Sequence, residues 1–170
     1  MYLDHDIRVN CYLIQEVIIA NYKIPIIEKI YEAYSAIADD RVHIDGDDIR
    51  VDSSDYAKTY TITKTPNTYI SNDNMSFWKQ TIGYPIIASM ILNGEIKYDH
   101  EIVKYFKDIN WKKLNTEHKN DYVKVAEMIL SDMSERGIDT DNIRRETEKV
   151  YAQIQTLSLP YIKSKIFPPK

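Results

Sequence analysis

The chain has 170 residues, of which 44% are hydrophobic and 28% charged, and its formal net charge is −4. This length and composition predict one globular domain, residues 1–170, that buries its own core. The mildly acidic charge argues against indiscriminate coating of nucleic acid. Residues 1–56 carry 12 acids and 5 bases, whereas residues 57–170 carry 14 acids and 17 bases. A local basic face that binds a specific polyanion is therefore still compatible with the sequence.

Glycine and cysteine counts exclude several kinds of site. The chain has 4 glycines, spread too widely to form a glycine-rich loop around a phosphate. Its single cysteine, Cys11, excludes an internal disulfide and a thiolate metal cluster and suits a reducing cytoplasm. The apolar run 85–92 is far shorter than the ~20 residues that span a bilayer, and the N-terminus has no basic export segment. We therefore expect a cytoplasmic protein with no membrane partner.

The first predicted elements are two helices. Apolar residues recur every three or four positions from Ile7 to Ile18, which predicts a helix over about 4–21. Pro25 suits a first helical turn, and a second apolar stripe follows it up to a predicted helix end near residue 39. We expect the two helices to pack as a hairpin over residues 4–39.

The pattern then changes to the alternation that is typical of β-strands. Asp45-Gly46 separates the first two alternating segments and suits a tight hairpin turn. The predicted strands are residues 41–44, 49–51, 58–63 and 68–70. They predict a small antiparallel sheet at about residues 41–71.

Helical character returns over residues 76–158. An almost entirely apolar segment follows Gly83-Tyr84-Pro85 and predicts a central helix that stops at Gly94. Three more helices are predicted from Asp99, from about Thr116 to Gly137, and from about 139, the last with heptad-like spacing that suits pairing with another protomer. The predicted class is α+β and mainly helical, with about five to six helices and the sheet inserted after the N-terminal hairpin.

We recognise no catalytic or metal-binding motif, and we predict no cofactor. The four histidines each have an acid nearby but no second ligand at the i, i+4 spacing that holds a metal. Cys11 lies on the apolar stripe of its predicted helix, so we expect it to be buried rather than nucleophilic. Seven aspartates occur between residues 39 and 55, but they lack the spacing of an EF-hand loop. We expect them to lie in turns.

The segment 104–113 interleaves basic and aromatic residues, a pattern that can hold phosphates while stacking on bases. The candidate nucleic-acid-binding residues are Lys104, Lys107, Trp111, Lys112 and Lys113. The alternative is a helix that turns its charged side chains to water, with Trp111 packed inside the domain.

The order of elements from Ile49 to Ile96 resembles a SWIM-type zinc finger. It comprises a strand, a Ser-Ser turn, a strand at Tyr60-Thr61-Ile62, a short strand, and a helix that begins after Gly83-Tyr84-Pro85. SWIM families have a Cys-x-Cys pair before this helix and a Cys-x-His pair at its start, but here those positions hold no zinc ligand. The resemblance implies a metal-free unit that contacts DNA or protein and is held together by Ile62, Ile70 and Trp78.

The function predicted first is a non-enzymatic, intracellular protein-interaction module. The missing catalytic groups, the opposite charge of the two ends and the heptad-like last helix motivate it, and the expected partner is another protein or a second copy of the chain. Two alternatives stay open. One is a small nucleic-acid-associated protein that uses residues 104–113, and the other is an enzyme whose site is assembled from distant segments.

Overall fold

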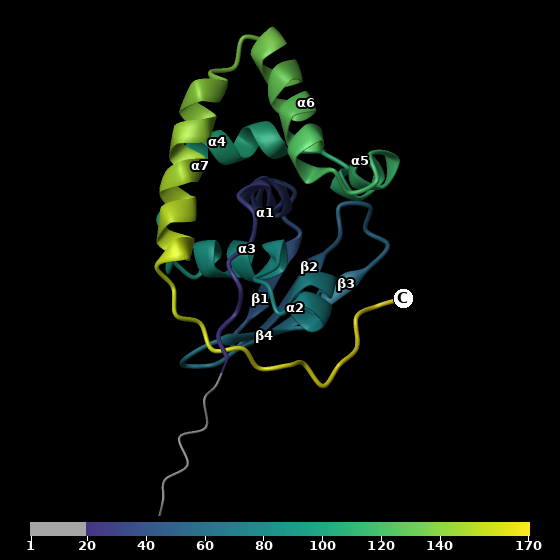
Figure 1. Ribbon diagram of the computed structural model, residues 1–170, viewed down its shortest axis with the longest axis vertical. Helices are drawn as coiled ribbons and strands as arrows, with labels where there is room; N and C mark the ends of the chain where they lie inside the picture. Colours follow the sequence, from purple (N-terminus) through teal and green to yellow (C-terminus); the bar gives the residue numbers. More distant parts are fainter. Residues whose placement is uncertain (1–19) are drawn as a thin grey trace, which may run out of the picture.

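The protein is described by a computed structural model, which covers residues 20–170 (Figure 1). The first half of this range contains the whole sheet. Its elements are α1 (Glu28–Ala38), β1 (Val42–Asp45), β2 (Asp48–Asp52), β3 (Thr59–Lys64), β4 (Tyr69–Ser71), α2 (Asn74–Lys79) and α3 (Tyr84–Leu92). The remaining elements are helical, namely α4 (His100–Val103), the 3₁₀-helix η1 (Lys104–Phe106), α5 (Trp111–Glu117), α6 (Tyr122–Glu135) and α7 (Thr140–Gln155). The predicted α+β class is confirmed.

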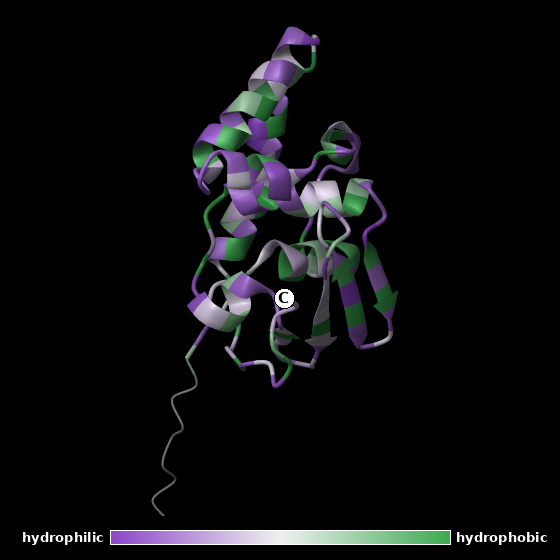
Figure 2. Ribbon diagram, turned by 90° about the vertical axis from the view of Figure 1, so that its right-hand side faces the viewer, coloured by the Kyte–Doolittle hydropathy of each residue, from purple (hydrophilic) through white to green (hydrophobic). Residues whose placement is uncertain are grey.

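The four strands form an antiparallel sheet in chain order, β1-β2-β3-β4. Asp45 pairs with Asp48 at the first turn, so the loop between them is Gly46-Asp47. Gly46 has a φ of +60°, a left-handed conformation that glycine adopts without a side-chain clash. Hydrophobic and hydrophilic residues alternate along the strands (Figure 2). The predicted β-hairpin at Asp45-Gly46 and the predicted antiparallel sheet are confirmed.

The hydrophobic core lies between the sheet and the helices above it. Ile49, Val51 and Ile62 are buried on one face of the sheet, and α3 packs against both this sheet and α1. Residues 85–91 of α3 are all buried, which confirms the predicted central helix. Helices α6 and α7 form an antiparallel pair on the side of α1 away from the sheet (Figure 1). One continuous set of buried apolar side chains therefore joins the sheet to the helices.

Aspartate and asparagine side chains begin five of the helices in residues 20–170. Each accepts a hydrogen bond from a backbone N–H of the first helical turn, which would otherwise lack a partner. These capping residues are Asp73 for α2, Asp99 for α4, Asn110 for α5, Asp121 for α6 and Asp139 for α7. Asp73 is the one that also contributes to the candidate site.

The described residues contain one helix of the predicted N-terminal hairpin, α1, which precedes the sheet. The first helix of that hairpin, at about 4–21, lies almost wholly outside residues 20–170. The chain that leads into α1 pairs with other segments instead. The Tyr22 backbone N–H donates to the Leu159 carbonyl oxygen over 2.8 Å, and Lys23 forms a bridge with Thr81. These pairings hold the segment outside a helical conformation.

The helix predicted from about Thr116 to Gly137 is present as α6, but it begins later, at Tyr122, because Lys119 and Asn120 take φ values of +54° and +62°. Such angles end a right-handed helix. Since α5 is a separate helix before this break and α2 is separate from α3, residues 20–170 contain seven α-helices, above the five to six predicted. No helix in this range is long and apolar enough to cross a bilayer.

Candidate functional site

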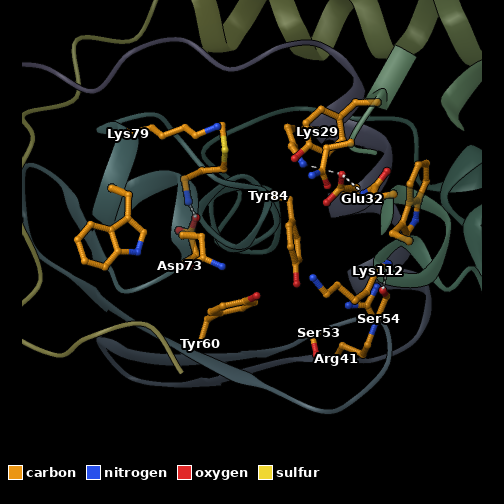
Figure 3. A pocket seen from close by; sticks show the side chains of 17 residues that line it. Lys29, Glu32, Arg41, Ser53, Ser54, Tyr60, Asp73, Lys79, Tyr84 and Lys112 are labelled. Carbon is orange, nitrogen blue, oxygen red and sulfur yellow. Dashed lines mark hydrogen bonds and ion pairs between the residues drawn. The ribbon is translucent and has the colours of Figure 1, made fainter. Parts of the chain in front are cut away.

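A cavity of about 250 Å³ lies where α1, the β2–β3 loop, α2, α3 and α5 meet (Figure 3). Its wall contains an unusual number of charged and aromatic side chains. The charged ones are Lys29, Glu32, Arg41, Asp73, Lys79 and Lys112, and the aromatic ones are Tyr60, Trp78, Tyr84, Trp111 and Tyr122. Because these residues come from segments far apart in the sequence, only folding brings them together.

The α1 side of the cavity holds a buried ion pair. The Lys29 Nζ atom lies 2.7 Å from Glu32 Oε1, and the two side chains are only 6% and 8% exposed. Asn115 Nδ2 donates a second hydrogen bond to the same oxygen over 3.2 Å. The Lys29 Nζ atom also lies 3.7 Å from the centre of the Tyr122 ring, a cation–π contact. Glu32 is thus anchored through one oxygen by two donors.

Asp73 forms the opposite side of the cavity and is also buried. Its Oδ1 accepts from the backbone N–H groups of Met75 and Ser76 at 2.9 and 3.1 Å, and its Oδ2 accepts from Ser71 Oγ at 2.7 Å. Burial raises the pKa of this carboxyl group, although these hydrogen bonds oppose the shift. Gly83 leaves room for it, since a Cβ there would lie 2.2 Å from Asp73 Oδ1. The carboxylate is therefore tightly enclosed.

Two phenol groups face the cavity from the sheet and from α3. The rings of Tyr60 and Tyr84 meet edge to face with centroids 6.3 Å apart, and both hydroxyls point toward the space between the walls (Figure 3). Burial raises the pKa of Tyr60 to about 12 and raises that of Tyr84 well above its ordinary value. Both phenols are protonated near neutral pH, as ordinary tyrosines are, and can donate hydrogen bonds.

The remaining cations differ in how they are held. Arg41 is buried and donates to Asp39 Oδ2, to the Asp52 carbonyl and to Ser35 Oγ at 3.3, 2.7 and 3.2 Å. By contrast, Lys79 and Lys112 are exposed, and neither side chain forms an ion pair within residues 20–170. The Lys112 backbone N–H donates to Ser54 Oγ over 2.8 Å, which ties the start of α5 to the β2–β3 loop. This bond places Lys112 beside the cavity.

Helix α5 contributes two enclosed polar atoms that have no hydrogen-bond partner. They are Nε1 of Trp111 and Oδ1 of Asn115, both buried residues of the cavity wall. The two residues are four positions apart and so lie on the same face of the helix. Buried polar groups normally have a partner, so these two atoms are exceptions within the described residues.

The five residues predicted to bind nucleic acid lie at different places in the structure. Trp111 is 3% exposed and belongs to the core, while Lys112 lies beside the first cavity. Lys104, Lys107 and Lys113 line a second cavity of about 620 Å³ between η1, α5 and α6. Of these, Lys104 pairs with Glu101 at 2.8 Å and Lys113 pairs with Glu117 at 4.0 Å. The nucleic-acid function stays a prediction.

The other candidates from the sequence lie in separate places. His43 Nε2 is 3.1 Å from Asp52 Oδ2 on the exposed side of the sheet. Ser53 Oγ donates to Asp55 Oδ1 over 2.6 Å, which lowers the pKa of that aspartate. Cys11 lies outside the described residues. Within residues 20–170, no three histidine, cysteine, aspartate or glutamate side chains gather in a way that could hold a metal ion.

The sequence contains no pattern that identifies the cavity. Lys29 and Glu32 are three positions apart, a spacing that is also common on the solvent face of a helix. Asp73 follows Ser71 in a polar segment that reads as an ordinary helix cap. Only the packing of α2, α3 and α5 around α1 encloses these residues.

The fold is an α+β architecture with a cavity beside its sheet that is lined by charged and aromatic side chains. The chain belongs to the family described as uncharacterised conserved protein UCP014422, whose model matches residues 22–160. This match includes every residue of the cavity wall. Neither a curated protein nor a solved structure matches the chain.

The family match overturns the resemblance to a SWIM-type zinc finger. A single family model covers nearly the whole chain, and the segment 49–96 is an internal part of it. The packing also differs from the expected unit. Trp78, which was expected to hold that unit together, is 61% exposed, and the β-strands pack under α1 and α3.

Proposed function

We propose that this protein binds a small anionic molecule that carries one planar ring. The observation that carries the proposal is the charge of the cavity wall. Four cationic side chains line it with two carboxylates that already accept hydrogen bonds from protein groups. Lys29 and Arg41 are paired with Glu32 and Asp39, so the charges left for a ligand are those of Lys79 and Lys112. The wall is therefore complementary to an added negative charge.

The two exposed lysines are the groups expected to contact the anion. Lys79 and Lys112 have no carboxylate partner in the described part of the chain, so they need not give up an ion pair when a ligand binds. The protonated phenols of Tyr60 and Tyr84 add two neutral donors. Charged hydrogen bonds of this kind are stronger than neutral ones.

The size and the aromatic content of the cavity define the rest of the ligand. Pockets for drug-sized molecules typically measure about 300–1,000 Å³. At about 250 Å³, this cavity fits one ring with an acidic group. The rings of Tyr60, Tyr84 and Trp78, which line the cavity, offer faces or edges for a planar ring to pack against.

This proposal differs from the function predicted first from the sequence. The protein-interaction module and the nucleic-acid-associated protein stay predictions. The cavity is closer to the third alternative, because its residues come from α1, the sheet, α2, α3 and α5. Ligand binding is the step that an enzyme and a non-catalytic binding protein share.

Thermal unfolding with phenyl phosphate and benzoate as probes tests the proposal. At a concentration about 100-fold above Kd, binding stabilises the folded state by about 2.7 kcal/mol, which raises Tm by about 5–10 °C for a chain of this size. Phenol has the ring without the charge and benzylamine has the opposite charge. We expect a smaller increase with phenol and none with benzylamine.

The double variant K79Q/K112Q locates the binding site. We expect it to weaken phenyl phosphate binding at least about tenfold in calorimetric titration, because each lysine provides a charged hydrogen bond. The matched control K107Q/K124Q removes two exposed lysines away from the cavity and is expected to bind normally. Equal binding by both variants, or no binding of either anion, would contradict the proposal.

A further inference from the structure

A cluster of large apolar side chains is exposed on the side of the molecule where the C-terminal segment crosses α2. Its centre is the contact between the rings of Trp78 and Phe167, and Ile162 and Ile166 belong to it as exposed residues of the same C-terminal segment as Phe167; the exposed fractions of Trp78, Ile162, Ile166 and Phe167 are 61%, 43%, 59% and 69%. We call this cluster the tail patch. Large apolar side chains that are exposed together, rather than singly, are typical of a surface that binds something.

Tertiary contacts hold the tail patch in place. The Phe167 ring lies 5.1 Å from that of Phe77 and 6.4 Å from that of Trp78, between ring centres. The buried Asn72 donates from Nδ2 to the Phe167 carbonyl oxygen over 3.1 Å and accepts from the Thr61 backbone N–H over 2.7 Å. The exposed rings are thus presented in a defined arrangement.

The charged residues of the C-terminal segment that carries most of the tail patch are all basic. Residues 156–170 contain three lysines and no acid, and Lys79 adds a fourth cation beside Trp78. The Lys163 Nζ atom lies 4.6 Å from the centre of the Phe77 ring and 5.6 Å from that of Trp78. The Lys163 ammonium therefore lies over the two rings at cation–π distance and brings a positive charge to the tail patch.

We propose that the tail patch binds the surface of an anionic lipid bilayer. Tryptophan, phenylalanine and isoleucine next to lysines are the combination that enters the interface between lipid headgroups and acyl chains. The lysines add attraction to anionic headgroups. The attachment is peripheral and does not require a spanning helix.

Two features favour lipid over other anionic partners. Ile162, Ile166 and Phe167 line neither of the two cavities described above, so they do not form a groove that would receive a peptide. A single nucleic-acid strand would stack on the aromatic rings but would gain little from the exposed isoleucines. A bilayer accepts both the aromatic and the aliphatic side chains.

This inference departs from the expectation of no membrane partner, which depended on the lack of a long apolar run. Three polar residues separate Ile162 from the adjacent Ile166 and Phe167, and Trp78 lies far earlier in the chain. Folding places Trp78 of α2 against Phe167, so the combined surface is absent from any local sequence pattern.

Vesicle binding by the full-length protein tests the inference. The probes are vesicles of phosphatidylcholine alone and vesicles that contain about one third phosphatidylserine, at low and at physiological salt. We expect co-sedimentation with the anionic vesicles and weaker binding at higher salt. The chain has two tryptophans and Trp111 is buried, so a blue shift of the fluorescence on binding reports Trp78 entering the lipid.

Two variants and a control assign the binding to the tail patch. We expect I166S/F167S to lose at least about tenfold in vesicle affinity. We expect K163Q/K165Q to lose about fivefold per lysine. The control V123S/M128S removes two exposed apolar side chains of α6 and should bind like the unmodified protein.

Three outcomes would overturn the inference. They are no binding to anionic vesicles, equal losses in I166S/F167S and in the α6 control, and binding of single-stranded oligothymidine but not of lipid. None of these variants changes a residue of the cavity wall, so anion binding at the cavity is expected to be unaltered in all of them. Failure of one proposal is thereby distinguishable from failure of the other.

Discussion

The cavity wall and the tail patch depart from the usual placement of side chains in opposite directions. At the cavity, Lys29 and Glu32 are charged but removed from water, whereas at the tail patch Trp78 and Phe167 are large and apolar but exposed. The cavity compensates for its buried charge with an ion pair and a hydrogen bond from Asn115. No comparable compensation covers the tail patch within residues 20–170. The buried charges of the cavity are therefore stabilised within the protein, whereas the exposed apolar side chains of the tail patch are the surface for which we propose a partner.

The largest expected effect comes from breaking the buried ion pair. Glu32→Ala leaves Lys29 buried without its counter-charge, so we expect the free energy of unfolding to fall by about 3–5 kcal/mol. Urea denaturation followed by circular dichroism measures this change. The matched control is Asp132→Ala, which breaks the exposed pair with Arg136 and is expected to cost less than about 1 kcal/mol.

A second comparison separates loss of the ion pair from loss of packing. The double variant K29M/E32L replaces both charges with apolar groups of similar size, and buried pairs often tolerate such replacement. We expect it to be more stable than Glu32→Ala. If Glu32→Ala and Asp132→Ala cost the same, the contrast between a buried and an exposed pair would be refuted.

The next effect is a pH dependence that originates at Asp73. Because burial raises the pKa of this carboxyl group in the folded state above 3.8, the folded state binds its proton more tightly than the unfolded state does. The stability that Asp73 contributes is therefore present at low pH and is lost as pH rises from about 4 through the folded pKa. Asp73→Asn keeps a capping oxygen but cannot ionise.

We accordingly expect the stability of Asp73→Asn relative to the unmodified protein to increase between about pH 4 and pH 7. Urea denaturation at several pH values measures this difference. Asp139→Asn makes the same chemical change at the exposed cap of α7 and is the matched control. A relative stability of Asp73→Asn that falls as pH rises would show that the sign is wrong.

The smallest effect is expected at the tail patch. Trp78→Ser removes an exposed ring, so the free energy of unfolding should change by about 0.5 kcal/mol or less. Phe77→Ala, one position earlier in the same helix, empties a buried site and should cost about 3–5 kcal/mol. A large loss of stability in Trp78→Ser would indicate that this ring supports the fold rather than a binding surface.

The sequence predicted the elements whose causes are local. The β1–β2 hairpin follows from an Asp-Gly turn between alternating segments, and α3 follows from an apolar run between Gly83 and Gly94. The break between α5 and α6 was missed because Lys119 and Asn120 take left-handed angles without a glycine. Asparagine adopts this conformation more readily than most residues, but its presence alone does not predict a break.

The candidate site could not be predicted in the same way. Residues 104–113 were predicted to bind nucleic acid because basic and aromatic residues are interleaved there. The fold instead buries Trp111 and places the lysines at two different cavities. No site was predicted at Lys29 and Glu32, because their spacing is common on exposed helices. Whether such a pair faces water depends on α5, which lies about eighty residues further along the chain.

By itself, the sequence determined the α+β class, the sheet, the central helix and the exclusion of glycine-rich phosphate loops. The reason is that turn chemistry, capping and hydrophobic periodicity act over a few residues. Only the tertiary structure decided that Lys29, Glu32 and Asp73 are enclosed around one cavity and that Trp78 and Phe167 share one exposed surface. Burial is a property of contacts between distant segments, and no local pattern specifies which segments will meet.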